Sequence, residues 1–150
     1  MAYFAELTNE NIVSRVIVVN DSDTSYVENP FTNTVVQVEA IGVAYLQRKY
    51  GTDTRWKLTT DDTGFRGRSA GIGMTYMENV ATLGVGSTDI FIPQKPYDSW
   101  NLGSSDVDWY PPITEPTLTD DQIAAGSYYT WDEDAYQADN TTGWILTTPE

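Results

Sequence analysis

The chain of 150 residues can bury the core of one ordinary domain or of two very small ones, and its 40% hydrophobic content predicts that it folds. It contains no cysteine and no histidine, which excludes disulfides, thiolate nucleophiles, Ser-His-Asp triads and zinc sites with nitrogen or sulfur ligands. The net charge of −14 argues against phosphate binding, so we expect no nucleic-acid partner and no membrane partner.

The first expected element is a β-hairpin. Residues 2–7 form a short apolar strand, residues 8–11 (TNEN) have turn chemistry, and residues 12–19 are rich in β-branched side chains. Residues 16–19 are apolar on both faces of such a strand. The second strand is therefore predicted to be central in its sheet and covered on both sides.

A helix is predicted over residues 34–50, after a polar loop at residues 20–33. Thr34 and Gln37 fit a capping box, in which each side chain satisfies a backbone N–H of the first turn. Apolar side chains then recur at steps of three and four residues, and Gly51 is suited to end the helix.

Two more strands are expected at residues 54–60 and 65–77, with a turn, DDTG, at 61–64. The glycines in the second of these strands do not follow the G-x-G-x-x-G spacing, and no Lys-Ser or Lys-Thr follows them. We interpret them as positions of strand twist, bulge or close approach, not as a phosphate-binding loop.

From residue 74 onward one pattern recurs: an aromatic strand, a loop, a second strand and a proline. Each copy is a predicted hairpin whose second strand ends at proline, because proline has no N–H for the ladder. The copies lie at residues 74–93, 97–112 and 128–149.

A proline-rich connector separates the last two hairpins. It is expected to be extended. Thr119 and Gln122 form a second capping box, which predicts a short helix over about residues 120–125.

Four tryptophans flank the loops of the two later hairpins: Trp100, Trp109, Trp131 and Trp144. In the structural interpretation, they form cross-strand or diagonal pairs, each ring burying on the order of 150 to 250 Å² in hairpins that have little other core. In the functional interpretation, exposed planar rings on an acidic surface are stacking platforms for sugars.

Charged clusters also have two interpretations. Acidic residues at 21–23, 106–108 and 132–134 offer oxygen ligands for Ca²⁺, but none is followed by the Gly and the distal Glu of a calcium-binding loop. We therefore predict solvated turns, with no metal site and no cofactor. Arg66 and Arg68 form either a docking patch for an acidic partner or a charge balance for neighbouring carboxylates.

Four stretches of the chain resemble a family of small virion proteins of marine tailed bacteriophages, notably those that infect cyanobacteria: MAYFAELTNENIVSRVIVVND, FRGRSAGIGMTY, FIPQKPYDSWNL and LTDDQIAAGSYYTWDED. The resemblance covers most of the chain and is weakest at residues 20–34 and 78–90. It implies a structural protein of the phage particle, and one implied role is a knob or decoration protein on the capsid exterior. The chain has longer insertions than the family pattern, including residues 80–87, which leaves its docking partner open.

The expected fold class is α+β, mainly β. Residues 1–95 are expected to form an antiparallel sheet with one helix, and residues 96–150 a region of aromatic hairpins with a short helix. Residues 1–95 hold all 8 basic and 11 of the 22 acidic side chains, whereas residues 96–150 hold 11 acidic and no basic ones. No run approaches the roughly 20 apolar residues that span a bilayer, and residues 1–11 lack the features of a signal peptide. We expect a soluble protein made without export.

The expected function is that of a non-enzymatic virion protein, on the capsid exterior rather than the tail, assembled in the host cytoplasm. Its expected partner is the major capsid protein or another virion protein, met through Arg66, Arg68 and the exposed side of the first hairpin. The alternative is a host-carbohydrate-binding adhesin or tail-associated protein that uses exposed Trp and Tyr, with host surface polysaccharide as its partner. A carboxylate-based hydrolase of envelope glycans has the least support.

Overall fold

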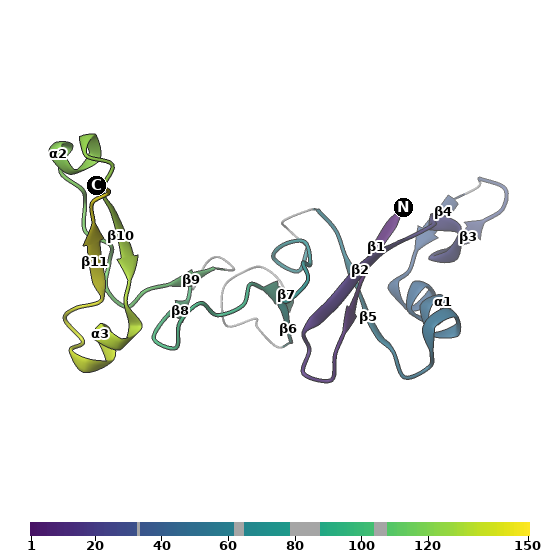
Figure 1. Cartoon of the computed structure of the whole chain (residues 1–150). Coiled ribbons are helices and arrows are strands. Elements are labelled where there is room, and N and C mark those ends of the chain that lie inside the picture. The colour runs from purple at the N-terminus through teal and green to yellow at the C-terminus, as the bar shows by residue number, and fades with distance from the viewer. Residues whose placement is uncertain (33, 62–64, 79–87, 104–107) are drawn as a thin grey trace. The chain divides into compact units, whose positions relative to one another are not determined.

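The computed structural model describes residues 1–32, 34–61, 65–78, 88–103 and 108–150. The chain forms two compact units. The N-terminal unit comprises Met1–Gln94 and Gly103–Asp108, and the C-terminal unit comprises Lys95–Leu102 and Trp109–Glu150. The fold is α+β and mainly β, as expected, and every pair of strands in the described part is antiparallel (Figure 1).

A three-stranded sheet forms the centre of the N-terminal unit. Strands β1 (Ala2–Leu7) and β2 (Val13–Val19) form the predicted hairpin, and β5 (Arg55–Thr59) pairs with the other side of β1. The strand order is β2-β1-β5, so the central strand is β1 and the prediction of a central β2 is wrong. Strand β2 is not covered on both faces either, because Val18 is 50% exposed. An apolar run in the sequence shows neither whether a strand is central nor whether both of its faces are covered.

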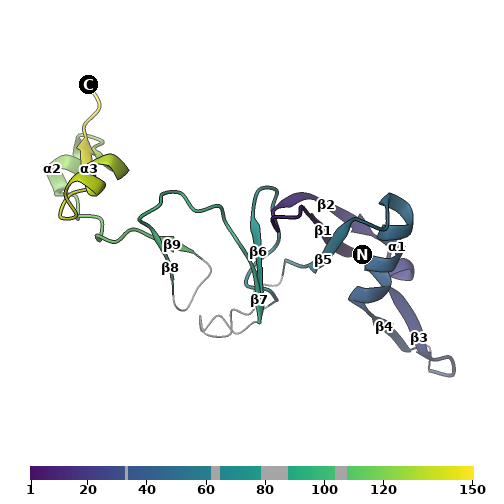
Figure 2. The same ribbon diagram turned by 90° about the horizontal axis from the view of Figure 1, so that it is seen from below.

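Each face of this sheet has its own hydrophobic core. On one face, Phe4, Val19 and Trp56 pack with Leu46 of the helix α1 (Glu39–Tyr50). On the other face, Ala5, Leu7 and Val13 pack with Tyr76 of β6 (Thr75–Glu78) and Phe91 of β7 (Asp89–Ile92). The sheet therefore lies between α1 and the β6–β7 hairpin, as the two views in Figures 1 and 2 show.

The helix is shorter than predicted. Residues Thr34–Gln37 form strand β4, which pairs with β3 (Ser25–Asn29), and α1 begins after Val38, an N-cap residue whose side chain makes no capping bond. The run Thr-Val-Val is β-branched, and this preference for extended backbone outweighs the apparent capping box. The expected loop at residues 20–33 instead contains the 3-10 turn Asp21–Asp23 and strand β3. Gly51 ends the helix with a φ of 128°, as predicted.

The strand predicted at 65–77 is also shorter. Only Thr75–Glu78 is strand, because the backbone before it has positive φ at Arg66 (50°), Gly67 (77°) and Gly73 (86°). These angles lie outside the extended region. The turn expected at 61–64 and the loop of the hairpin at 74–93 fall largely outside the described residues, but β6 and β7 pair as that hairpin requires.

The C-terminal unit contains two hairpins and two short helices. Strand β8 (Asn101–Leu102) pairs with β9 (Trp109–Tyr110), and β10 (Tyr128–Trp131) pairs with β11 (Trp144–Thr147). Helix α2 (Asp120–Ala124) has the predicted capping box, with Thr119 Oγ1 accepting from the Gln122 N–H and Gln122 Oε1 accepting from the Thr119 N–H. Helix α3 (Glu133–Ala138) was not predicted and lies between β10 and β11.

Candidate functional site

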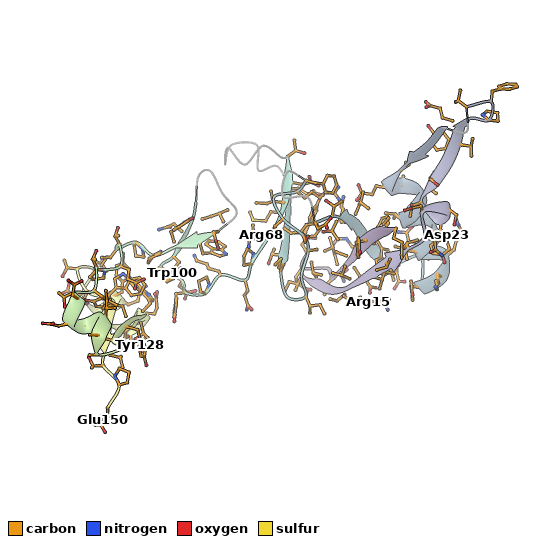
Figure 3. All side chains as sticks on the ribbon, turned by 90° about the horizontal axis from the view of Figure 1, so that it is seen from above. Arg15, Asp23, Arg68, Trp100, Tyr128 and Glu150 are labelled. Carbon is orange, nitrogen blue, oxygen red and sulfur yellow. The ribbon has the colours of Figure 1, made fainter. Side chains whose placement is uncertain are left out.

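Trp131 is the centre of an aromatic cluster in the C-terminal unit. Its side chain is buried, and three rings surround it. Trp144 and Trp100 meet it edge to face, with ring centroids 5.3 Å and 6.2 Å away, and Tyr136 of α3 lies at 5.3 Å. Figure 3 shows the side chains that gather around Trp100. The cluster joins the segment before β8 to the β10–β11 hairpin.

The β10–β11 ladder positions two of these rings. Trp131 and Trp144 are direct cross-strand partners, the arrangement in which side chains of an antiparallel pair interact most closely. Gly143, which precedes Trp144, has a φ of 152°, and a Cβ at this position would lie 2.6 Å from the Trp131 ring. Glycine at 143 thus allows the indole to lie directly against the backbone.

Glu133 fixes the cluster through four hydrogen bonds. Its carboxylate accepts from Trp131 Nε1 at 2.8 Å, from the Ser99 Oγ–H at 2.7 Å, from the Ser99 N–H at 3.1 Å and from Gln137 Nε2 at 2.8 Å. These donors favour the charged carboxylate, and the bond from Trp131 has the largest effect, lowering the pKa of Glu133 to about 2. One carboxylate thus holds Trp131 and the segment that bears Trp100.

A depression of about 360 Å³ opens beside the cluster. Its walls are partly exposed aromatic rings and a polar rim: Trp100, Tyr110, Pro111, Thr114, Glu115 and Trp144. Trp144 Nε1 donates to the backbone carbonyl of Ile113 at 2.8 Å, which holds the connector after β9 against the hairpin. The site therefore combines aromatic surface with an exposed carboxylate at its edge.

The four predicted tryptophans divide between the two interpretations. Trp131 is buried and cannot stack on a ligand, whereas Trp100 and Trp144 are partly exposed and line the depression. Trp100 and Trp109 are not direct partners in the ladder, where Trp109 lies opposite Leu102. Lys95 lies over Trp109, with its Nζ 5.4 Å from the centroid of an indole ring.

Two residues of the depression were missed by sequence analysis: Tyr110 and Glu115. Tyr110 directly follows Trp109 in β9, where alternation places neighbours on opposite faces. Glu115 lies in the proline-rich connector, which was interpreted only as a spacer. Trp144 holds this segment to the hairpin, which is a contact between distant parts of the sequence. Nothing in the residues next to Glu115 distinguishes it from the other acidic residues.

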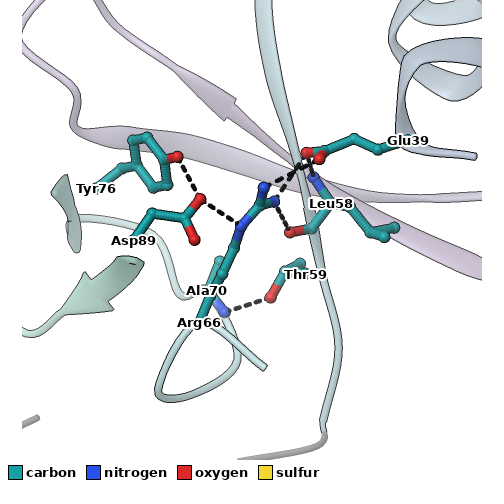
Figure 4. A network of polar contacts seen from close by, with 7 residues as sticks. All are labelled: Glu39, Leu58, Thr59, Arg66, Ala70, Tyr76 and Asp89. Carbon is teal, nitrogen blue, oxygen red and sulfur yellow. Dashed lines mark hydrogen bonds and ion pairs between the residues drawn. The ribbon is translucent and has the colours of Figure 1, made fainter. Parts of the chain in front are cut away.

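Arg66 does not form a docking patch. Its side chain is buried, and it donates to Glu39 Oε1 and Oε2 at 2.8 and 2.9 Å, to Asp89 Oδ2 at 2.7 Å and to the Leu58 carbonyl at 2.7 Å (Figure 4). The second interpretation, charge balance for neighbouring carboxylates, describes Arg66 correctly. Arg68 is half-buried, and docking through it stays a prediction.

The network around Arg66 has the electrostatics of a structural ion pair. Burial alone would raise the pKa of Glu39, but hydrogen bonds from Arg66 and from the Leu58 N–H outweigh it, so this pKa lies below its usual value. Burial, together with the hydrogen bond to Asp89, raises the pKa of Tyr76 well above its usual range. Near neutral pH, Glu39 therefore stays ionised and Tyr76 stays neutral. Their hydrogen bonds are made to Arg66 and Asp89 inside the unit.

The predicted acidic turns have local roles where the structure describes them. Met1 N and Asp21 form an ion pair at 2.7 Å, and Asp132 caps α3 by accepting from the Ala135 N–H. Within the described ranges, no three acidic, Cys or His side chains gather as metal ligands. The cluster at 106–108 lies mostly outside those ranges.

No family model, curated protein or solved structure matches the chain. None of the helices in the described part has the length and apolar character that would let it cross a bilayer.

Proposed function

We propose that this chain is a non-enzymatic structural protein of a phage virion, a knob or decoration protein on the capsid exterior. The proposal is supported by the resemblance of four stretches of the sequence to small virion proteins. The structural observation that carries it is the separation into two compact units of different charge density: the N-terminal unit has 7 basic and 13 acidic side chains among 100 residues, and the C-terminal unit has 1 basic and 9 acidic among 50. One unit is available for attachment, and the other is an acidic module whose aromatic cluster holds it together without a large core.

Attachment is assigned to the N-terminal unit, through the exposed side of its first hairpin. Tyr3 and Val18 are direct partners across β1 and β2, and their side chains are 46% and 50% exposed. Neighbouring apolar side chains at a sheet surface are suited to a protein partner. The partner in this proposal is the major capsid protein or another virion protein, and the virion assembles in the host cytoplasm. A specific contact of this kind buries on the order of 1,000 Å² or more.

Decoration stabilises a shell by mass action. A protein that binds only the assembled shell adds RT ln(1 + [L]/Kd) per site, about 2.7 kcal/mol at a free concentration of 100 Kd. Particles that lack the protein should then disassemble at a lower temperature than complete particles.

Immunogold labelling of intact particles, read by electron microscopy, tests the location. We expect label over the head exterior. Label restricted to the tail tip, label seen only in opened heads, or particles free of the protein would refute the proposal.

The attachment surface is tested by Val18→Asp, because a charge at this position opposes an apolar contact. The number of copies per particle, measured by mass spectrometry, should fall at least severalfold. Ile123→Asp is the matched control, since Ile123 is 60% exposed and lies in the C-terminal unit. Equal occupancy for Val18→Asp and the unsubstituted protein, or equal losses for the two variants, would remove the assignment to the first hairpin.

A second candidate is a carbohydrate-binding adhesin or tail-associated protein. It is favoured by the partly exposed indoles of Trp100 and Trp144 at the depression. Titration with host envelope polysaccharide should then change the tryptophan fluorescence in a saturable way. A spectrum that stays constant over a wide range of concentrations would exclude this candidate.

A further inference from the structure

The aromatic depression of the C-terminal unit has the chemistry of a cation site. The faces of indole and phenol rings carry the negative part of the ring quadrupole, and they attract ammonium and guanidinium groups. Two indoles and one phenol ring line the depression, and Glu115 adds a full negative charge at its edge. We propose that this depression binds a lysine or arginine side chain presented by a basic segment of a partner protein.

The charge of this part of the chain favours a basic partner. The C-terminal unit carries 9 acidic side chains and one basic side chain. An acidic field of this kind attracts a cationic segment and repels anionic groups, while it gives no advantage to a neutral ligand. Charge complementarity thus selects a basic peptide over a neutral sugar, which would use the same rings.

The chain itself uses contacts of this type. Lys95, the one basic residue of the C-terminal unit, lies over Trp109. In the N-terminal unit, the guanidinium of Arg15 lies 4.4 Å from the ring centroid of Tyr50. In the part of the chain that the structure describes, no basic side chain lies over Trp100 or Trp144. These two indoles remain for a cation from outside.

The walls of the depression are held in place before any ligand arrives. Trp100 and Trp144 both pack edge to face on the buried Trp131, and Trp144 is fixed to the Ile113 carbonyl. Rigid walls reduce the entropy cost of binding. A flexible lysine or arginine side chain therefore loses its own freedom on binding, while the site loses little.

The test uses the purified full chain labelled with ¹⁵N and follows the indole N–H signals by NMR. The probe is a short capped peptide with one central arginine between glycines and serines. The matched peptide has citrulline, the neutral isostere, in place of the arginine. We expect the arginine peptide to shift the signals of Trp100 and Trp144 in a saturable, salt-sensitive way, and the citrulline peptide to leave them in place.

Glu115→Gln tests the site without disturbing the fold, because Glu115 is exposed and the substitution keeps its shape. An exposed ion pair is worth about 0.2 to 1 kcal/mol, so the affinity for the arginine peptide should fall about 1.4- to fivefold. Glu150→Gln is the control, since it removes the same charge outside the depression and should leave the affinity nearly unchanged. Unchanged indole signals in the free variant confirm that it is folded.

Three results would overturn the proposal. Equal losses in the two variants would show a diffuse attraction between an acidic protein and a basic peptide. Equal shifts with the arginine and citrulline peptides would show that charge plays no part. Saturable shifts of the same signals by a neutral oligosaccharide, with none from the arginine peptide, would assign the site to glycans.

This inference goes beyond the proposed function and does not depend on it. The peptide titration uses the isolated chain, whereas the labelling experiment uses intact particles. Either one can fail while the other succeeds.

Discussion

Single residues in the C-terminal unit combine several roles. Trp131 is the ring on which Trp100 and Trp144 pack, and its N–H is one of the four donors to Glu133. Glu133 in turn bonds Ser99, which lies 34 positions before it in the chain. In such a small unit, a change at either residue loosens several contacts at once.

The stability of the C-terminal unit should depend on acid through Glu133. Its pKa in the folded chain, about 2, is below its ordinary value of 4.5. The ionised carboxylate therefore stabilises the fold fully above about pH 4.5, and this contribution is lost as the pH falls towards 2. Glu133→Gln should lack this part of the acid dependence, measured by urea unfolding at a series of pH values. Glu150→Gln should retain it, and identical pH profiles for Glu133→Gln and the unsubstituted chain would contradict the prediction.

The indole N–H groups of Trp131 and Trp100 should contribute differently to the free energy of unfolding. Trp131→Phe removes a bonded donor and replaces the central indole with a smaller ring, so we expect a loss of about 2 to 3 kcal/mol in the free energy of unfolding. Trp100 Nε1 is buried and has no hydrogen-bond partner among the described residues. Trp100→Phe removes this unsatisfied donor together with some contact area, so its cost should be about 1 kcal/mol or less. Urea unfolding followed by circular dichroism compares the two, and a larger loss for Trp100→Phe would refute this ranking.

At the scale of elements, one close contact links the strands of the C-terminal hairpin, and one arginine side chain links the elements of the N-terminal unit. In the C-terminal unit, the β10–β11 hairpin closes where the Trp131 ring lies against Gly143. In the N-terminal unit, Arg66 joins three elements: Glu39 at the start of α1, Leu58 in β5 and Asp89 in β7.

Gly143→Ala should open the hairpin end. The new Cβ would meet the Trp131 ring, and the positive φ adds backbone strain, so we expect a loss of about 2 to 4 kcal/mol. Gly126→Ala is the matched control in the same unit, because its φ is 71° but its Cβ would meet only Pro149 at 3.9 Å. That variant should lose about 1 kcal/mol, from backbone strain alone. Thermal unfolding measures both, and equal losses would show that the ring contact has no effect.

Arg66→Met should destabilise the N-terminal unit by about 3 kcal/mol or more, because it leaves the partly buried carboxylates of Glu39 and Asp89 without their counter-charge. The indole NMR signal of Trp56, the one tryptophan of this unit, reports its unfolding in urea. Arg68→Met is the comparison variant and should cost less, since Arg68 is only half-buried, whereas Arg66 is buried between two carboxylates. A loss for Arg66→Met no larger than for Arg68→Met would be inconsistent with a structural bridge.

Elements with local signals were predictable, and elements defined by distant partners were not. The capping box of α2 and the β1–β2 hairpin follow from adjacent residues, and both are confirmed. Thr34 and Gln37 fit the same capping pattern, but Thr34–Gln37 is a strand that pairs with β3. Strand β3 was not expected, because it lies in a segment whose polar composition is typical of a loop. The start of α3 had a signal, since Asp132 is a good N-cap followed by two acidic residues. It was missed because the flanking tryptophans favoured one continuous hairpin.

At the scale of the whole molecule, the negative charge should make the stability of the C-terminal unit depend on salt. Charges of one sign repel within the folded unit, and salt screens them over about 10 Å at 0.1 M. Raising the salt concentration from about 0.01 M to about 0.5 M should raise the melting temperature of this unit more than that of the N-terminal unit. Indole signals distinguish the two transitions, because Trp56 belongs to one unit and the other four tryptophans to the other. A larger shift for Trp56 would contradict the prediction.

The sequence indicated that tryptophans form the candidate site, but not which residues come together there. The predicted pairing of tryptophans within each hairpin is correct for Trp131 and Trp144. The contact of Trp100 with Trp131 joins different hairpins, and no local pattern specifies such a contact. The buried position of Arg66 likewise depends on Glu39, 27 residues away, so the same side chain fitted a docking patch and an internal ion pair equally well.

The edge-to-face pair of Trp131 and Trp144 also gives the protein an optical signature. Indoles whose centroids are 5.3 Å apart share their electronic excitation, and the coupled transitions of a chiral pair split into two bands of opposite sign. Trp100, 6.2 Å from Trp131, adds to the coupling, so the amplitude of this exciton signal follows the packing of the aromatic cluster without any added dye.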